Sequence, residues 1–458
     1  MQVMISRYLC LEGIAIPSLV LLLFAGDIKA EETHPSDAVS IGHGQLSPDF
    51  SDLHEGKSWK DWSTMTGDWN GRRITLLEEG ITFSSSYVND ILGCVSGGKA
   101  RGIAEAGSFG IFMNVDFGKF SHFDGLQLGV SVVYREGTNL SKKKIGNQFT
   151  VAQVYGGQTY HLNEFYLEQT FLDATLKLKG GRLDAGNDFL QSDLYYEFVN
   201  NGFDGNPVAI FYNSPFSAYP NATWGIVLQV TFWEKIVAKM GIYNANANVV
   251  KNRYHGFNWS FHSTDGALLI GEWALLVNQG KGDTGYPGNY RVGAYYYTGT
   301  EKEKFLGGKA HGNYGYYILL DQMVVSFGDV GAERGITPFI ALLFAPSDRD
   351  IMPFFLASGL VCWGLFPARP KDSLNLGFLY GKYSTDMRKA QQQAKNLRLL
   401  GPFGDQPQNF EALIEFNYWF EVNPWLAITP DLQYIINPSG FGTIPNALAC
   451  GVQVGFTF

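Results

Sequence analysis

A stretch of acidic and aromatic residues near the middle of the chain combines side chains that could bind a hydroxyl-rich molecule. Residues 184–222 include Asp184, Asp188, Tyr195, Tyr196 and Glu197. Carboxylates accept hydrogen bonds from hydroxyl groups, and flat aromatic rings can pack against the C–H face of a ring-shaped solute. This stretch is therefore our first candidate for a ligand-contacting segment.

Charged residues on other segments could oppose this stretch. They are the bases Lys177, Lys179, Arg182 and Arg291 and the acids Glu168 and Glu272. Such side chains exchange hydrogen bonds readily with water, so they suit transient contacts better than tight binding. The alternative for each of them is a solvated charge without contact to a ligand.

The sequence gives little support to an enzyme site. A G-x-S-x-G motif is absent, the eight histidines are scattered, and no Cys-x-x-Cys pair, phosphate loop or cofactor fingerprint occurs. We therefore expect neither a cofactor nor a metal. A hydrolase whose Ser and His meet across loops stays open as a remote alternative.

The elements that must position these side chains are short alternating strands. The 458 residues include 15% aromatic and only 17% charged residues, and the mean hydropathy of −0.06 argues against a bundle of membrane helices. Apolar and polar residues alternate in segments of about ten residues, the length of a tilted strand that crosses a membrane. We predict sixteen strands at 81–89, 108–117, 126–135, 164–172, 174–183, 223–232, 235–244, 267–277, 290–299, 314–325, 336–346, 358–366, 374–384, 412–421, 425–436 and 447–458.

The connections between these segments alternate in length. Long polar stretches such as 90–107, 136–163 and 184–222 follow odd segments, and short turns such as 423–424 follow even ones. This parity is typical of an all-β, sixteen-stranded antiparallel transmembrane barrel with long external loops. The longest connection, 184–222, is the natural one to fold inward, and 386–400 is the one connection with helical character.

The N-terminus reads as an export signal followed by a polar segment. Residues 1–30 carry Arg7, an apolar run and a cleavage site that we place after Ala30. We expect residues 31–61 to be a polar periplasmic segment and 62–458 to form the barrel. The net charge of −9 gives no sign of nucleic-acid binding.

The stretch "MTGDWNGRRITLLEEGITFSSSYVND", residues 65–90, resembles the start of the OprB family of carbohydrate-selective porins. The resemblance continues through "EFYLEQTF", "KLKGGRLDAGNDFLQSD" and "IEFNYWFEVNPWLAITPDLQYIINPSG" and covers nearly all of 62–458. It implies a monomeric barrel in a Gram-negative-type outer membrane that admits sugars by facilitated diffusion. It also implies that the last strand pairs with the first, and that the assembly machinery reads the terminal Phe458.

Alternatives to a sugar porin remain at this point. Lys177, Lys179, Arg182 and Arg291 could instead favour small anions or carboxylates, because the charge inside a pore decides its selectivity. A structural barrel with a blocked interior is a further alternative. The run Lys142 to Lys144 lies in an expected external loop, where it could contact lipopolysaccharide or simply be solvated.

Overall fold

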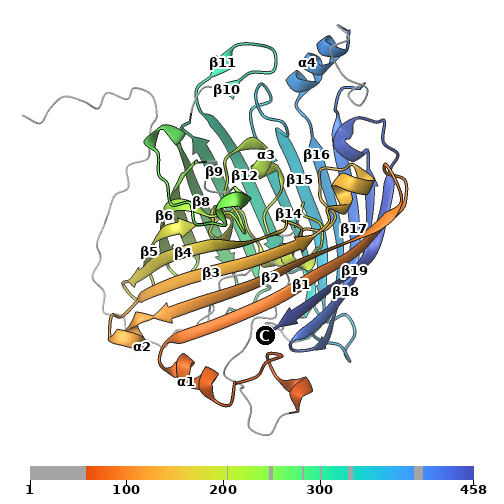
Figure 1. Ribbon diagram of the computed structural model, residues 1–458. Coiled ribbons are helices and arrows are strands. Elements are labelled where there is room, and N and C mark those ends of the chain that lie inside the picture. Colours follow the sequence, from red (N-terminus) through yellow and green to blue (C-terminus); the bar gives the residue numbers. More distant parts are fainter. Residues whose placement is uncertain are drawn as a thin grey trace, which may run out of the picture. The chain divides into compact units, whose positions relative to one another are not determined.

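The chain folds into a closed antiparallel barrel of sixteen strands (Figure 1). The computed structural model describes residues 58–203, 205–246, 251–280, 283–299, 302–328, 334–396 and 406–458, so the expected signal peptide and most of the polar segment lie outside the described residues. Each of the sixteen predicted segments corresponds to one barrel strand. The strands are β1 (Ile81–Ser96), β2 (Gly102–Asp116), β3 (Leu126–Gly137), β4 (Thr159–Phe171), β5 (Leu176–Leu183), β6 (Thr223–Phe232), β7 (Ile236–Asn244), β8 (Ala267–Val277), β9 (Gly288–Tyr297), β12 (Asn313–Gln322), β14 (Gly335–Phe344), β15 (Phe354–Trp363), β16 (Ser373–Lys382), β17 (Phe410–Asn423), β18 (Leu426–Ile436) and β19 (Ala447–Thr457).

Pairing between the first and last strands closes the barrel. Tyr87 of β1 lies opposite Phe456 of β19, and the ladder continues to Leu92 opposite Gly451. The backbone N–H of Phe458 donates to the carbonyl oxygen of Ser85 at 2.9 Å. Closure pairs the backbone groups of the last strand on both sides, which a spanning strand in lipid requires.

The connection after β1 is much shorter than the sequence suggests. The predicted loop 90–107 is wrong, because β1 and β2 pair in register from Asn89 opposite Gly107 to Cys94 opposite Gly102. Residues 97–101 alone make the turn, and Gly97 and Gly98 have positive φ angles of 68° and 64° there. Residues 90–96 and 102–107 thus extend the two strands beyond their predicted ends.

Among the described residues, the α-helices are short and lie before the first strand or in the connections between strands. They are α1 (Arg72–Glu78), α2 (Phe117–Ser121), α3 (Ala209–Asn213) and α4 (Thr385–Asn396). The helix expected at 386–400 is confirmed as far as Asn396, and the rest of it lies outside the described residues. Within the described ranges, no helix is long and apolar enough to cross a membrane. Short strands β10 (Lys302–Glu303) and β11 (Lys309–Ala310) form a separate hairpin, and β13 (Val325–Ser326) pairs with β14.

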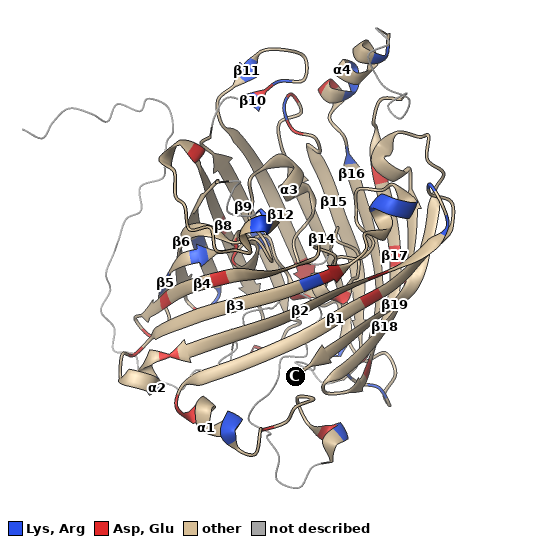
Figure 2. Ribbon diagram, in the orientation of Figure 1, with Lys and Arg blue, Asp and Glu red and all other residues tan. Residues whose placement is uncertain are grey.

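The barrel carries its large exposed apolar side chains on the outside and fills its interior with loop residues. Ile226, Met240 and Trp273 are exposed on the outer wall, and charged positions are sparse along the strands (Figure 2). Inside, Phe198 and Phe203 of loop 184–222 stack at 4.4 Å and pack against Phe339 of β14. This arrangement has an apolar surface facing outward, as a barrel in lipid requires.

Candidate pore constriction

Loop 184–222 leaves β5 and turns into the barrel interior at once. A carboxylate oxygen of Asp184 accepts a hydrogen bond of 2.9 Å from the backbone N–H of Asn187, which caps the 3₁₀ turn Ala185–Asn187. A second 3₁₀ turn, Asp193–Glu197, follows. The loop therefore enters the interior as a sequence of tight turns rather than as an extended arm.

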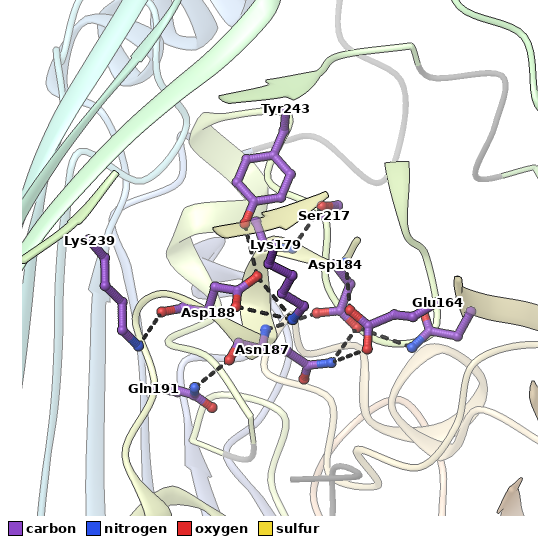
Figure 3. Close-up of polar contacts among 11 residues, drawn as sticks. Glu164, Lys179, Asp184, Asn187, Asp188, Gln191, Ser217, Lys239 and Tyr243 are labelled. Carbon is purple, nitrogen blue, oxygen red and sulfur yellow. Dashed lines mark hydrogen bonds and ion pairs between the residues drawn. The ribbon is translucent and has the colours of Figure 1, made fainter. Parts of the chain in front are cut away.

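Asp188 is the point at which the basic strands hold this loop (Figure 3). The Lys179 ammonium on β5 lies 3.2 Å from its Oδ1 atom. On β7, the Tyr243 hydroxyl donates to Oδ2 at 3.1 Å, and Lys239 Nζ donates to the backbone oxygen of Asp188 at 3.0 Å. Strands β5 and β7, which lie on either side of β6, thus fix one acidic residue of the loop.

A pair of acids lies on the other side of this cluster (Figure 3). Glu164 of β4 accepts hydrogen bonds from the Asp184 backbone N–H at 3.1 Å and from the Asn187 side chain at 2.9 Å. The Asn163 and Asn187 amides each donate to Asp184 Oδ2 at 3.2 Å. Complete burial, together with the nearby Glu164 carboxylate, raises the pKa of Asp184 well above its usual range.

The loop is next fixed to β8, β9 and β12. Glu272 accepts a hydrogen bond of 3.1 Å from the Leu190 backbone N–H, and the Ser192 hydroxyl donates to Asp321 at 3.2 Å. Arg291 donates to the backbone oxygen of Gln191. Each strand of this wall thus contributes one charged side chain to the attachment.

The same loop then crosses to β16 and β17. Glu415 accepts hydrogen bonds from the backbone N–H groups of Val199 at 2.6 Å and Asn200 at 3.2 Å. The Ser373 hydroxyl donates to Glu197 at 2.6 Å. Burial raises the pKa of Glu197 to about 7, against the opposing effect of the hydrogen bonds from Ser373 and Asn375. Loop 184–222 therefore spans the interior, with attachments to β4 on one side and to β17 on the other.

A comparison of the sequence with models of protein families assigns the chain to a family. A family model described as "Carbohydrate-selective porin, OprB family" matches residues 100–458. The chain belongs to this family. Its barrel is thus that of a carbohydrate-selective porin, as the sequence motifs predicted.

Relatives and solved structures agree with the OprB assignment. Porin B of Pseudomonas aeruginosa is 30% identical over 422 residues, which cover 86% of this chain and 91% of the relative. A putative porin QuiX of Acinetobacter baylyi is 24% identical over 418 residues, covering 87% and 94% of the two chains. The high-pH structure of Pseudomonas putida OprB has a TM-score of 0.81 at 26% identity and covers 88% of this chain and 100% of that one. This chain therefore has the fold of that OprB structure.

A second loop of this OprB porin also folds inward, and the sequence did not predict it. Glu411 of β17 accepts hydrogen bonds from the backbone N–H groups of Gln148 at 2.9 Å and Phe149 at 2.8 Å, so loop 138–158 also folds inside. The Asn200 amide donates to the Phe149 carbonyl oxygen at 3.0 Å and links the two loops. The alternation of the sequence placed Glu411 and Glu415 on one face of β17. It could not show which backbone N–H groups these carboxylates accept.

The site residues predicted from the sequence fall into three environments. Asp184, Tyr195, Glu197 and Glu272 are buried and fasten the loop, and the Tyr195 ring packs 5.5 Å from that of Phe339. Half-buried positions that keep contact with solvent are Asp188, Tyr196, Lys177, Glu168 and Arg291, whereas Lys179 is buried in its pair with Asp188.

Arg182 lies apart from the other predicted bases. In the sheet it stands between Phe165 of β4 and Trp224 of β6. Phe165 is exposed on the outer wall, next to Tyr166, whose ring lies 4.3 Å from the Lys179 ammonium inside. Since cross-strand neighbours share a face, Arg182 projects outward and does not join the loop cluster.

Proposed function

We propose that this porin passes small carbohydrates by facilitated diffusion through a constriction between loop 184–222 and strands β5 to β9. The observation that carries the proposal is a belt of polar side chains at one level of the wall. Lys177, Gln229, Lys239 and Glu272 lie side by side in the registers of β5 to β8. Lys239 also holds Asp188, so the belt adjoins the loop.

The residues at this constriction have two roles, since some position the loop and others contact the solute. Buried Asp184, Tyr195, Glu197 and Glu272 position the loop, because their polar atoms or rings are occupied by protein partners. The half-buried charges Glu168, Lys177, Asp188, Lys239 and Arg291 exchange hydrogen bonds between water and solute hydroxyls, and Tyr196 offers an aromatic face. Weak contacts of this kind keep the solute moving.

The setting of the channel follows from the same proposal. The barrel is a monomer in the outer membrane, with loop 184–222 entering from the external side, and it catalyses no reaction. Its partners are sugar solutes, outer-membrane lipid with lipopolysaccharide, and the assembly machinery that reads Phe458. Nucleic acid is not among them.

Single-channel conductance of the refolded mature chain in a planar bilayer tests the proposal. We expect the open current to fall to a plateau as the concentration of glucose or maltose rises. An uncharged non-sugar solute of similar size should not produce such a saturable decrease. A channel that conducts ions and ignores both sugars would contradict the sugar site. A barrel that gives no channel at all would contradict the pore.

A porin for small carboxylates is the second candidate, because Lys177, Lys239 and Arg291 gather on one side of the interior. The reversal potential in a salt gradient separates the two proposals. A strong anion preference together with block by a dicarboxylate, and none by sugar, would favour the second. Weak ion selectivity with saturable sugar block favours the first.

A further inference from the structure

The connection between β7 and β8 lies against the outside of the barrel. We call residues 251–262 the outer strap (drawn green in Figure 1). The Trp259 ring lies 5.8 Å from that of Phe165 on β4 and 5.5 Å from that of Trp224 on β6. The Asn244 amide at the end of β7 donates to the His262 carbonyl oxygen at 3.3 Å. The outer strap therefore crosses the outward faces of β4 to β7.

Its second attachment is to the extended end of β4. The His255 ring stacks on Tyr160 at 4.3 Å, and the His255 carbonyl oxygen accepts a hydrogen bond of 2.9 Å from the Leu162 backbone N–H. This backbone bond satisfies a strand edge that extends past the last residue of β5. The outer strap thus continues the wall where β5 has ended.

The outer strap covers a charged side chain on the outer wall, that of Arg182. Its side chain projects outward but is only 2% exposed, because the strap lies over it. Arg182 Nη1 donates to the Asn258 carbonyl oxygen at 3.1 Å, and Nε donates to that of Asn163 at 3.2 Å. A guanidinium facing hydrocarbon would be costly, so these contacts keep the charge away from lipid.

The free surface of the outer strap joins apolar and basic groups. Phe257 and Phe261 are 60% and 63% exposed, and Ile226 and Ile242, on the strands that the strap crosses, are exposed as well. Arg253 is exposed, stacks over the Tyr254 ring at 4.6 Å and donates to its hydroxyl at 2.6 Å. A groove of about 640 Å³ is lined by Arg253, Tyr254, Phe257, Asn258, Trp259, Ser260 and His262.

We propose that the outer strap binds the phosphorylated head of a glycolipid in the outer leaflet. Large apolar side chains are exposed both on the outward faces of β6 and β7 and on the strap, so the surface that meets lipid includes the strap. Arg253 then meets a phosphate, the groove accommodates the sugar of the head group, and Phe257 and Phe261 contact the acyl chains. This inference rests on the proposed outer-membrane location with loops outside. It is independent of how the interior selects solutes.

Native mass spectrometry of the refolded barrel, titrated with bisphosphorylated lipid A, tests the inference. We expect Arg253→Glu to weaken binding roughly tenfold, because it removes a charge-assisted hydrogen bond and adds repulsion. The matched control is Lys143→Glu, the same charge reversal at an exposed lysine of loop 138–158, and it should bind lipid A as the wild type does. Sugar block of conductance should be unchanged in Arg253→Glu, which separates this inference from the proposed function.

Other outcomes would overturn the proposal. Equal loss of lipid in both variants would mean general charge attraction, and a loss confined to Lys143→Glu would place the lipid at the lysine run. Stable dimers that Phe257→Ser and Phe261→Ser abolish would identify the outer strap as an interface between copies of the chain. Dephosphorylated lipid A that binds as tightly as the bisphosphorylated form would exclude a phosphate contact at Arg253.

Discussion

The Lys179 ammonium lies 3.2 Å from a carboxylate oxygen of Asp188, and this ion pair joins β5 to the inward loop 184–222. Both side chains are largely shielded, with 9% and 13% exposure. Removal of one partner of a shielded pair leaves an uncompensated charge, which typically costs about 3–5 kcal/mol. The position of the loop therefore depends strongly on this pair.

Lys179→Met should release the start of the loop from the wall. We expect a larger single-channel conductance and an affinity for sugar about tenfold weaker, equivalent to about 1.4 kcal/mol. Lys235→Met is the matched control, because Lys235 pairs with Asp283 at 3.5 Å while 52% exposed. Equal changes in both variants would show that loss of a positive charge, and not the loop attachment, alters the channel.

Glu415 should control the other end of the loop. It accepts the backbone N–H groups of Val199 and Asn200. Glu415→Ala should lower the free energy of unfolding by about 1–3 kcal/mol and make the open current noisier, because buried N–H groups lose their acceptor. Glu415→Gln retains one acceptor oxygen and should restore most of the stability and the quiet current. A variant Glu415→Ala with wild-type current noise would contradict a positioning role.

The alternation of apolar and polar residues was enough to predict the barrel strands. It was not enough to predict the contacts that fill the barrel interior. The number of strands follows from a local period of two, whereas the ends of β1 and β2 depend on how far the two strands pair with each other. For the site, the sequence identified the loop and its acids. It could not separate half-buried Asp188 from buried Glu197, because the partner of Glu197, Ser373, lies 176 residues away. Arg182 is three residues from Lys179, so a strict alternation would already have placed it on the opposite face.

Glu197 should make the stability of the porin depend on pH. Burial raises its pKa in the folded chain from 4.5 to about 7. The stabilisation that comes with the protonated form is complete below pH 4.5 and is lost as the pH rises through 7, for a total of about 3 kcal/mol. We expect Glu197→Gln to melt at a higher temperature than the wild type at pH 8 and at a similar temperature at pH 4. If the melting temperatures of the two proteins changed with pH in the same way, the pKa of Glu197 would not be raised in the folded chain.

Arg73 should be required for a stable junction between the N-terminal motif and the end of the barrel. Arg73 Nη2 donates to the Phe458 carbonyl oxygen at 2.9 Å, and Nη1 donates to the Thr64 hydroxyl at 2.6 Å and to the Gly67 carbonyl oxygen at 2.9 Å. Loss of this guanidinium leaves buried acceptors without their donor, which costs about 1–3 kcal/mol.

The neighbouring Arg72 provides the control for this prediction, because it begins the same helix but is exposed. We expect Arg73→Met to lower the melting temperature of the refolded barrel and to slow its closure, as followed by the heat-dependent gel mobility of folded barrels. Arg72→Met should change neither quantity. If both variants fold and melt like the wild type, the last strand is held by its pairing with β1 alone, and the N-terminal motif must serve another purpose.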